Sequence, residues 1–173
     1  MIMKIIIVAN SSWYIHNFRS NLIVELIEKG YKIFVVSPND KYSHILKNMN
    51  IQVINWKLDA SSINPIVQLT SIFKLFKIFK TIEPDFILSY TPKGNIFSGI
   101  SINFIKHDIK FVPNISGQGV SRNFNFVYRK FFIYLYKFAF LKAIKVYFQN
   151  DEDKKVFIKN KIINESKCKR IPG

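Results

Sequence analysis

The 173 residues, of which 49% are hydrophobic, are enough to bury one core without disulfides or metal staples. The 26 Lys and Arg against 11 Asp and Glu give a formal charge of +15, which favours an anionic partner: a phosphorylated substrate, a membrane surface or nucleic acid. The single cysteine, Cys168, excludes a disulfide framework and a Cys-based zinc site. The three histidines lie in unrelated segments without metal-ligand spacing, so we expect no metal.

The chain carries no apolar run near the roughly 20 residues that span a bilayer. Its amino terminus is typical of a strand rather than of a signal peptide. We therefore expect a cytoplasmic protein that is peripheral to the membrane. Two helical segments could touch a bilayer: 66–82, where Lys74, Lys77 and Lys80 share a side, and the aromatic, basic 126–141. For both segments the simpler alternative, an ordinary helix packed on the sheet with a solvated basic side, is favoured.

The chain begins with a pattern typical of a βαβ unit. Residues 5–9 are a buried strand, a polar loop follows, and apolar residues from Phe18 onward recur at helical spacing. Gly30 ends this helix, and 32–37 form the second strand. Ligands of open α/β sheets bind beyond the carboxyl ends of the strands, so the loop 10–19 is expected to line the working site.

This first loop lacks the glycine pattern of a dinucleotide-binding turn, so an NAD or FAD enzyme is disfavoured. Its hydroxyl, amide and guanidinium groups suit a sugar or a phosphate instead. The alternative is that Ser and Asn only cap the helix and that Arg19 lies in water. The groups in question are Asn10, Ser11, Ser12, Asn17 and Arg19.

The remaining pattern alternates strands and helices, which predicts an α/β fold with a Rossmann-like, doubly wound, mostly parallel sheet. Pro113 places the fifth strand near an edge or makes it short. Strands are expected over 51–55, 86–89, 110–115, 143–148 and from 168, with helices over 43–49, 66–82, 96–105, 126–141 and 152–159.

Two further loops are expected at the same end of the sheet. The fourth strand should lie beside the first, which brings Thr91, Lys93 and Asn95 opposite the first loop, at a helix start suited to an anion. Gly117 and Gly119 form a close glycine pair after the fifth strand, which permits close approach of a ligand or is a plain turn.

Six segments together resemble the amino-terminal half of family-4 glycosyltransferases, in order and at about the right spacing. The similarity covers the whole chain and is strongest to the capsule and glycan-assembly branch, which adds N-acetylhexosamines to undecaprenyl-diphosphate-linked sugars. The segments are ANSSWYIHNFRSNLI, LDASSINP, LSYTPKGNIFSG, NISGQGV, YFQNDEDKKVF and RIPG.

The resemblance implies a GT-B architecture of two Rossmann-like domains, with residues 1–173 as the acceptor-side domain and a donor-binding domain absent. It implies a nucleotide-sugar donor, in particular a UDP-sugar, an undecaprenyl-diphosphate-linked saccharide acceptor, the cytoplasmic membrane surface as partner, and retention of configuration without a cofactor. The chain alone is then expected to be inactive.

Carried over by motif position, the resemblance implies a set of substrate-binding residues. Many wider-family members place a histidine near the end of the fourth strand, where this chain has Ser89-Tyr90-Thr91, so no catalytic residue is assigned and His16 is a weak substitute. The substrate-binding set is Asn10, Ser11, Ser12, His16, Asn17, Arg19, Thr91, Lys93, Asn95, Gly117 and Gly119.

One alternative from another class is a non-catalytic α/β module that binds a membrane or a partner protein through its basic face. Nucleic acid ranks below both, because beyond its charge the sequence carries no recognition motif. An enzyme half should gain activity when the missing half is supplied, whereas a binding module should need nothing more.

Overall fold

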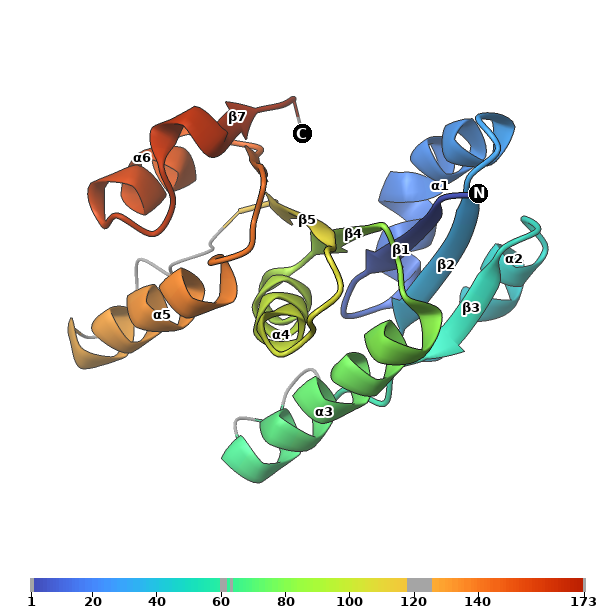
Figure 1. Ribbon diagram of the computed structural model, residues 1–173, viewed down its shortest axis with the longest axis horizontal. Coiled ribbons are helices and arrows are strands. Elements are labelled where there is room, and N and C mark those ends of the chain that lie inside the picture. Colours follow the sequence, from blue (N-terminus) through green and yellow to red (C-terminus); the bar gives the residue numbers. More distant parts are fainter. Residues whose placement is uncertain (1, 60–61, 63, 118–125, 173) are drawn as a thin grey trace.

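The computed structural model describes residues 2–59, 62, 64–117 and 126–172. The chain forms a seven-stranded, wholly parallel sheet in the order β3-β2-β1-β4-β5-β6-β7 (Figure 1). This confirms the predicted fold class and the predicted pairing of β4 with β1. The strands are β1 (Lys4–Val8), β2 (Lys32–Ser37), β3 (Gln52–Asn55), β4 (Phe86–Tyr90), β5 (Lys110–Ile115), β6 (Val146–Phe148) and β7 (Cys168–Arg170).

The helices cover the sheet on both faces, because strand residues alternate between two apolar cores. Ile5 and Ile7 face α1 and α2, whereas Ile6 and Val8 face the core shared by α3, α4, α5 and α6. Figure 1 shows α3, α4 and α5 on one side of the sheet and α1 and α2 on the other. The helices are α1 (Ser12–Glu28), α2 (Ser43–Lys47), α3 (Pro65–Ile82), α4 (Pro92–Asn103), α5 (Phe126–Ala139) and α6 (Asp151–Lys159).

Two helices begin earlier than the sequence pattern predicted. The expected loop 10–19 is wrong: α1 begins at Ser12, because the Ser11 hydroxyl accepts the Tyr14 amide proton as an N-cap. The helix expected from 96 begins at Pro92, whose fixed φ suits a first helical turn and whose missing N–H costs nothing there. The apolar pattern was a poor guide at α4 because its first turn, Pro92 to Asn95, carries no large apolar side chain.

The position of Pro113 also differs from the prediction, since β5 lies between β4 and β6 rather than at an edge. The carbonyl groups of Phe111 and Ile115 accept bonds from Ile144 and Gln149 on the β6 side. Pro113 lies midway between these two residues along the strand. Its nitrogen, which carries no hydrogen, therefore lies on the same side, toward β6. The β5·β6 ladder starts only at Asn114, which accommodates the missing donor.

The centre of the fold is the contact between α4 and its neighbours α3 and α5. A Cβ on Gly99 would lie only 2.1 Å from the Ala139 carbonyl oxygen, so α4 and α5 are in backbone contact there. Ser101 donates to the Ile72 carbonyl of α3 at 3.0 Å. This packing fixes the amino end of α4, where the candidate site lies.

Candidate functional site

The loops after β1 and β4 meet at the carboxyl edge of the sheet. The backbone N–H of Asn10 donates to Thr91 Oγ1 at 3.2 Å. A Cβ on Gly94 would lie 3.2 Å from the same oxygen and 3.5 Å from the Val8 carbonyl oxygen, so α4 starts in close contact with β1 and a side chain at position 94 would push on Thr91. The structure therefore brings the first and fourth βα loops together, as expected.

Thr91 adopts a backbone conformation that is rare for a β-branched residue. Its φ is 66° and its ψ 150°, and the side chain is buried. Such a conformation persists only where the surroundings impose it, and it occurs preferentially at functional sites. Here the Asn10 hydrogen bond and the following Pro92 fix the turn.

Arg19 lies beside this turn with its charge unpaired. Its guanidinium carbon is 4.4 Å from the centroid of the Tyr90 ring and 5.6 Å from that of Tyr14. The terminal nitrogens donate to the Phe18 carbonyl at 2.9 Å and to the Tyr14 hydroxyl at 3.1 Å, while Nε is buried without a partner. Among the described residues no carboxylate pairs with it, so the group is suited to an anion.

Tyr90, the last residue of β4, is the platform under Arg19. Burial raises its pKa to about 12, against the opposing effect of the Arg19 charge. The phenol therefore stays neutral at physiological pH and remains a hydrogen-bond donor. Its ring also contacts Tyr14, with centroids 5.9 Å apart.

The first two turns of α1 carry exposed rings, and a carboxylate from the loop after β2 lies against the start of this helix. Trp13 and Phe18 are 46% and 54% exposed, with ring centroids 5.6 Å apart in an edge-on arrangement. Asp40, from the loop after β2, accepts the Trp13 amide proton at 3.0 Å and the Tyr42 amide proton at 2.8 Å. This carboxylate satisfies a free donor of α1 and lies favourably in the helix dipole.

Two predicted substrate-binding side chains are instead internal. The Ser12 hydroxyl is fully buried and bonded to Ser37 and Ser43, each at 2.8 Å. Asn95 is also buried, accepting from Ser89 at 2.7 Å and donating to the Asn114 carbonyl at 2.8 Å. We correct both assignments to structural roles, because groups saturated inside the fold have nothing left to offer a ligand.

Three other predicted substrate-binding residues contact other parts of the chain through their side chains. Asn17 is exposed and donates to the Trp13 carbonyl at 2.8 Å. The His16 ring packs against Tyr42 at a tilt, with centroids 5.2 Å apart, on the α2 side of α1. Lys93 donates to the carbonyls of Asp59 and Ser62 at 3.0 and 2.7 Å, and desolvation lowers its pKa. Lys93 thus holds the loop before α3.

The glycine turn after β5 borders the same end of the sheet. Gly117 has a φ of 114°, which favours glycine, while Gly119 lies outside the described residues. A narrow recess, too small to hold a water molecule, is lined by Gly117, Thr91 and Tyr136 among others. The Tyr136 hydroxyl is buried without a partner, and burial raises its pKa far above the ordinary value.

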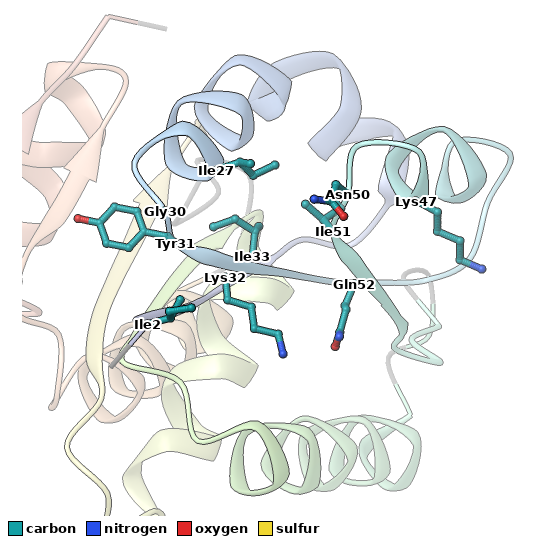
Figure 2. Close-up of a pocket in the computed structure, with 10 residues that line it drawn as sticks. All are labelled: Ile2, Ile27, Gly30, Tyr31, Lys32, Ile33, Lys47, Asn50, Ile51 and Gln52. Carbon is teal, nitrogen blue, oxygen red and sulfur yellow. The ribbon is translucent and has the colours of Figure 1, made fainter.

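The more spacious hollow lies at the opposite end of the strands. It has a volume of about 460 Å³ and is lined by residues near the amino ends of β2 and β3, including Lys32 and Gln52. Figure 2 shows Lys32 and Lys47 on different sides of it rather than converging. It lacks the converging polar groups of a ligand site.

Sequence reasoning missed Tyr90 and Asp40 as parts of the site. Tyr90 ends an apolar strand and Asp40 stands in a turn, so neither has a motif. The available signal for Tyr90 was its position directly before the Thr91 loop. Within the described residues no three His, Cys, Asp or Glu side chains gather into a cluster suited to a metal ion. In the same part of the chain no helix is long and apolar enough to cross a bilayer.

Comparison with known families decides the affiliation. The family described as glycosyl transferase 4-like matches residues 4–150. The chain belongs to the glycosyl transferase 4-like family. This confirms the resemblance found in the loop segments.

The relatives of this glycosyl transferase 4-like chain are longer proteins. It is 29% identical over 168 residues to the Campylobacter jejuni N,N'-diacetylbacillosaminyl-diphospho-undecaprenol alpha-1,3-N-acetylgalactosaminyltransferase, covering 95% of this chain and 44% of that protein. The chain thus spans less than half the length of the curated relative it matches.

Solved structures with the same fold include both transferases and epimerases. A Rickettsia africae glycosyltransferase has a TM-score of 0.70 at 20% identity, covering 99% of this chain and 43% of its own. Anabaena HepE in complex with UDP and glucose gives 0.68 at 16%, covering 98% and 44%. A Rickettsia bellii UDP-N-acetylglucosamine 2-epimerase gives 0.64 at 12%, covering 98% and 44%. These similarities show a shared fold and do not by themselves select a reaction.

Proposed function

We propose that this chain is the acceptor-side domain of a glycosyltransferase that transfers a sugar, an N-acetylhexosamine, from a UDP-sugar to a lipid-diphosphate-linked saccharide. Family membership supports transfer, and the C. jejuni relative is named as an enzyme acting on an undecaprenol-diphosphate-linked sugar. The observation in the chain itself that carries the proposal is Arg19. It is a partly buried cation with free donors, at the edge of the sheet where ligands bind.

The donor site belongs to a second domain in this proposal. The chain covers 44% of the C. jejuni relative, which leaves room for another domain of similar size in such a protein. The first loop has no glycine for close approach of a pyrophosphate. Two such domains form a GT-B enzyme, with transfer under retention of configuration in the cleft between them and with this chain inactive alone.

Peripheral attachment to the cytoplasmic face of the membrane is part of the proposal. Both α3 and α5 leave large apolar side chains exposed next to lysines. Phe73 is 55% exposed with the Lys77 ammonium 4.6 Å from its ring centroid, and Phe126 is 70% exposed with that of Lys130 at 4.4 Å. Aromatic rings beside cations suit an interface of acyl chains and anionic headgroups. A product of this kind would enter capsule or related glycan assembly.

The same exposed surface favours the second candidate function, a binding module for membranes or a partner that catalyses nothing. The two functions differ in whether adding a donor-binding domain produces sugar transfer. A binding module gains no turnover from it.

Sugar transfer from a panel of UDP-sugars to a short-chain prenyl-diphosphate-linked acceptor tests the proposal. It is measured for the 173-residue chain and for the chain extended by a carboxyl-terminal donor-binding domain. We expect transfer only from the extended protein. Absence of transfer from a folded extended protein, with vesicle binding intact in the chain alone, would instead favour the binding module.

A further inference from the structure

A row of polar side chains crosses three neighbouring strands beside Arg19. Tyr90 of β4 is in register with Asn114 of β5, and Asn114 with Tyr147 of β6. Their strand neighbours Ile87, Ile115 and Phe148 belong to the core under α3 to α6. Since side chains alternate along a strand, Tyr90, Asn114 and Tyr147 all point to the opposite face, where Tyr90 contacts the α1 core.

Asn114 is the unusual member of this polar row. It is only 5% exposed, yet its Oδ1 is buried without a hydrogen-bond partner. Buried amide oxygens are nearly always paired, and one left unpaired destabilises the fold. A leucine of similar volume would fill the same place without that penalty. The carboxamide is therefore unexplained by folding alone.

Asn114 lies between two tyrosines, one of which carries Arg19 on its ring. Tyr90 on one side carries the unpaired Arg19 guanidinium at 4.4 Å from its ring centroid. Tyr147 on the other side lies close enough to Tyr90 to interact with it electrostatically. Among the described residues neither phenol makes a hydrogen bond, so the row brings two unbonded hydroxyls and an unpaired amide oxygen close to a cation that no carboxylate neutralises.

We propose that Arg19 and the row Tyr90, Asn114 and Tyr147 form the subsite for the phosphate-bearing sugar of the acceptor. Arg19 pairs with a phosphate oxygen, and Asn114 Oδ1 accepts a hydrogen bond from a hydroxyl or acetamido N–H of the sugar next to it. This inference rests on the proposed function. It adds Asn114 and Tyr147 as residues that select the acceptor.

Two ligands distinguish anion binding by Arg19 from sugar binding by Asn114. Inorganic pyrophosphate contains only the anion, whereas farnesyl-diphospho-N-acetylglucosamine adds the sugar. Isothermal titration of the 173-residue chain measures both affinities without any donor or second domain. Failure of the proposed transfer reaction therefore does not affect this test.

Three variants carry the experiment. Arg19→Gln is expected to weaken both ligands roughly tenfold to a hundredfold, since it removes a charge-assisted pair. Asn114→Leu is expected to leave pyrophosphate unchanged, to weaken the sugar-bearing ligand roughly fivefold to tenfold and to raise the melting temperature. Ser98→Ala removes another buried, unpaired hydroxyl away from the row and should leave both affinities unchanged.

The proposal is overturned if the wild-type chain binds neither ligand, or if Asn114→Leu binds the sugar-bearing ligand as tightly as wild type. A lower melting temperature for Asn114→Leu would also overturn it, because the carboxamide would then serve the fold. Tyr147→Phe keeps the ring and removes only the hydroxyl. A selective loss of the sugar-bearing ligand in this variant would support the subsite independently, and equal affinity would remove Tyr147 from it.

Discussion

The guanidinium of Arg19 rests on the ring of Tyr90, 4.4 Å from its centroid, so a residue of α1 is held against the last residue of β4. The Tyr14 hydroxyl holds the same group from the side at 3.1 Å. Neutral aromatic partners fix the position of the cation without neutralising it. A ligand anion would therefore meet a guanidinium whose rotamer is already restricted.

Replacing Arg19 by Gln in the two-domain enzyme is expected to lower kcat/KM for transfer by about tenfold to a hundredfold, the value of one charge-assisted hydrogen bond. Arg19→Lys should recover only part of this, because an ammonium cannot stack and fork in the same way. Steady-state transfer kinetics measure both variants, with circular dichroism as the control for folding. Wild-type turnover in Arg19→Gln would exclude the assigned role.

Glycine at position 91 should be tolerated better than alanine. Both substitutions remove the oxygen that accepts the Asn10 amide proton, but only glycine relieves the positive φ of 66°. We expect Thr91→Gly to be more stable than Thr91→Ala by roughly 1 kcal/mol, the reverse of the usual order. Urea unfolding measures the difference. Equal stabilities would show that the turn is unstrained.

Gly99→Ala should destabilise the fold severely. The added Cβ would meet the Ala139 carbonyl oxygen at 2.1 Å, so α4 and α5 would have to separate. We expect a loss of about 3 kcal/mol or more, as for other overpacked cores. Gly30→Ala is the matched control: its Cβ meets open space and only the φ of 80° opposes it, which costs about 1 kcal/mol. Similar melting temperatures of the two variants would contradict the close contact.

Tyr136→Phe should stabilise the chain, by roughly 1 kcal/mol at neutral pH, because the removed hydroxyl is buried and unpaired. Burial raises the pKa of Tyr136 above its ordinary 10.0, so the folded state keeps a proton that the unfolded state releases. Wild-type stability is therefore complete below about pH 10 and falls as the pH rises further. The variant should lose less over that range. Thermal melts at neutral and alkaline pH test both points, and a less stable variant at neutral pH would contradict them.

The lysines of α3 should support vesicle binding at low salt. Replacing Lys74, Lys77 and Lys80 by Gln removes about 1 kcal/mol of attraction to anionic lipid for each charge near the surface. Co-sedimentation with phosphatidylglycerol vesicles measures the loss, and vesicles of neutral lipid are the control. If the triple substitution leaves vesicle binding unchanged, these lysines form an ordinary solvated helix face.

Sequence pattern predicted the central strands β1, β2, β4 and β5 well because most of their residues are buried on both faces. The second and fifth strands were predicted with the observed bounds, and β4 beside β1 followed from the doubly wound topology. The predicted helix starts were wrong at Ser12 and Pro92, and at Pro92 a first turn without large apolar side chains hides the apolar period. The prediction that Pro113 lies in an edge strand was wrong. Its strand has a partner on each side, but β6 is short and does not pair with Pro113.

The candidate site was only partly predictable. Residue type indicated Arg19 and Thr91, but type alone cannot tell an exposed amide from a saturated one. Asn95 was therefore placed in the site, while Asn114 in the next strand was not considered. The two differ in hydrogen bonding, since the Asn95 amide is bonded to Ser89 and Asn114 and the Asn114 Oδ1 is unpaired. Such bonds depend on contacts between distant segments and are absent from local pattern.

The Asp40 carboxylate at the amino end of α1 has a consequence for ligand selection. A helix start usually attracts phosphate, but here an oxygen of fixed negative charge already receives the Trp13 amide proton at 3.0 Å. A diphosphate arriving at the same place would be repelled by that charge and would have to displace it. The first βα turn of this chain therefore discriminates against the very groups that the same turn attracts in dinucleotide-binding folds.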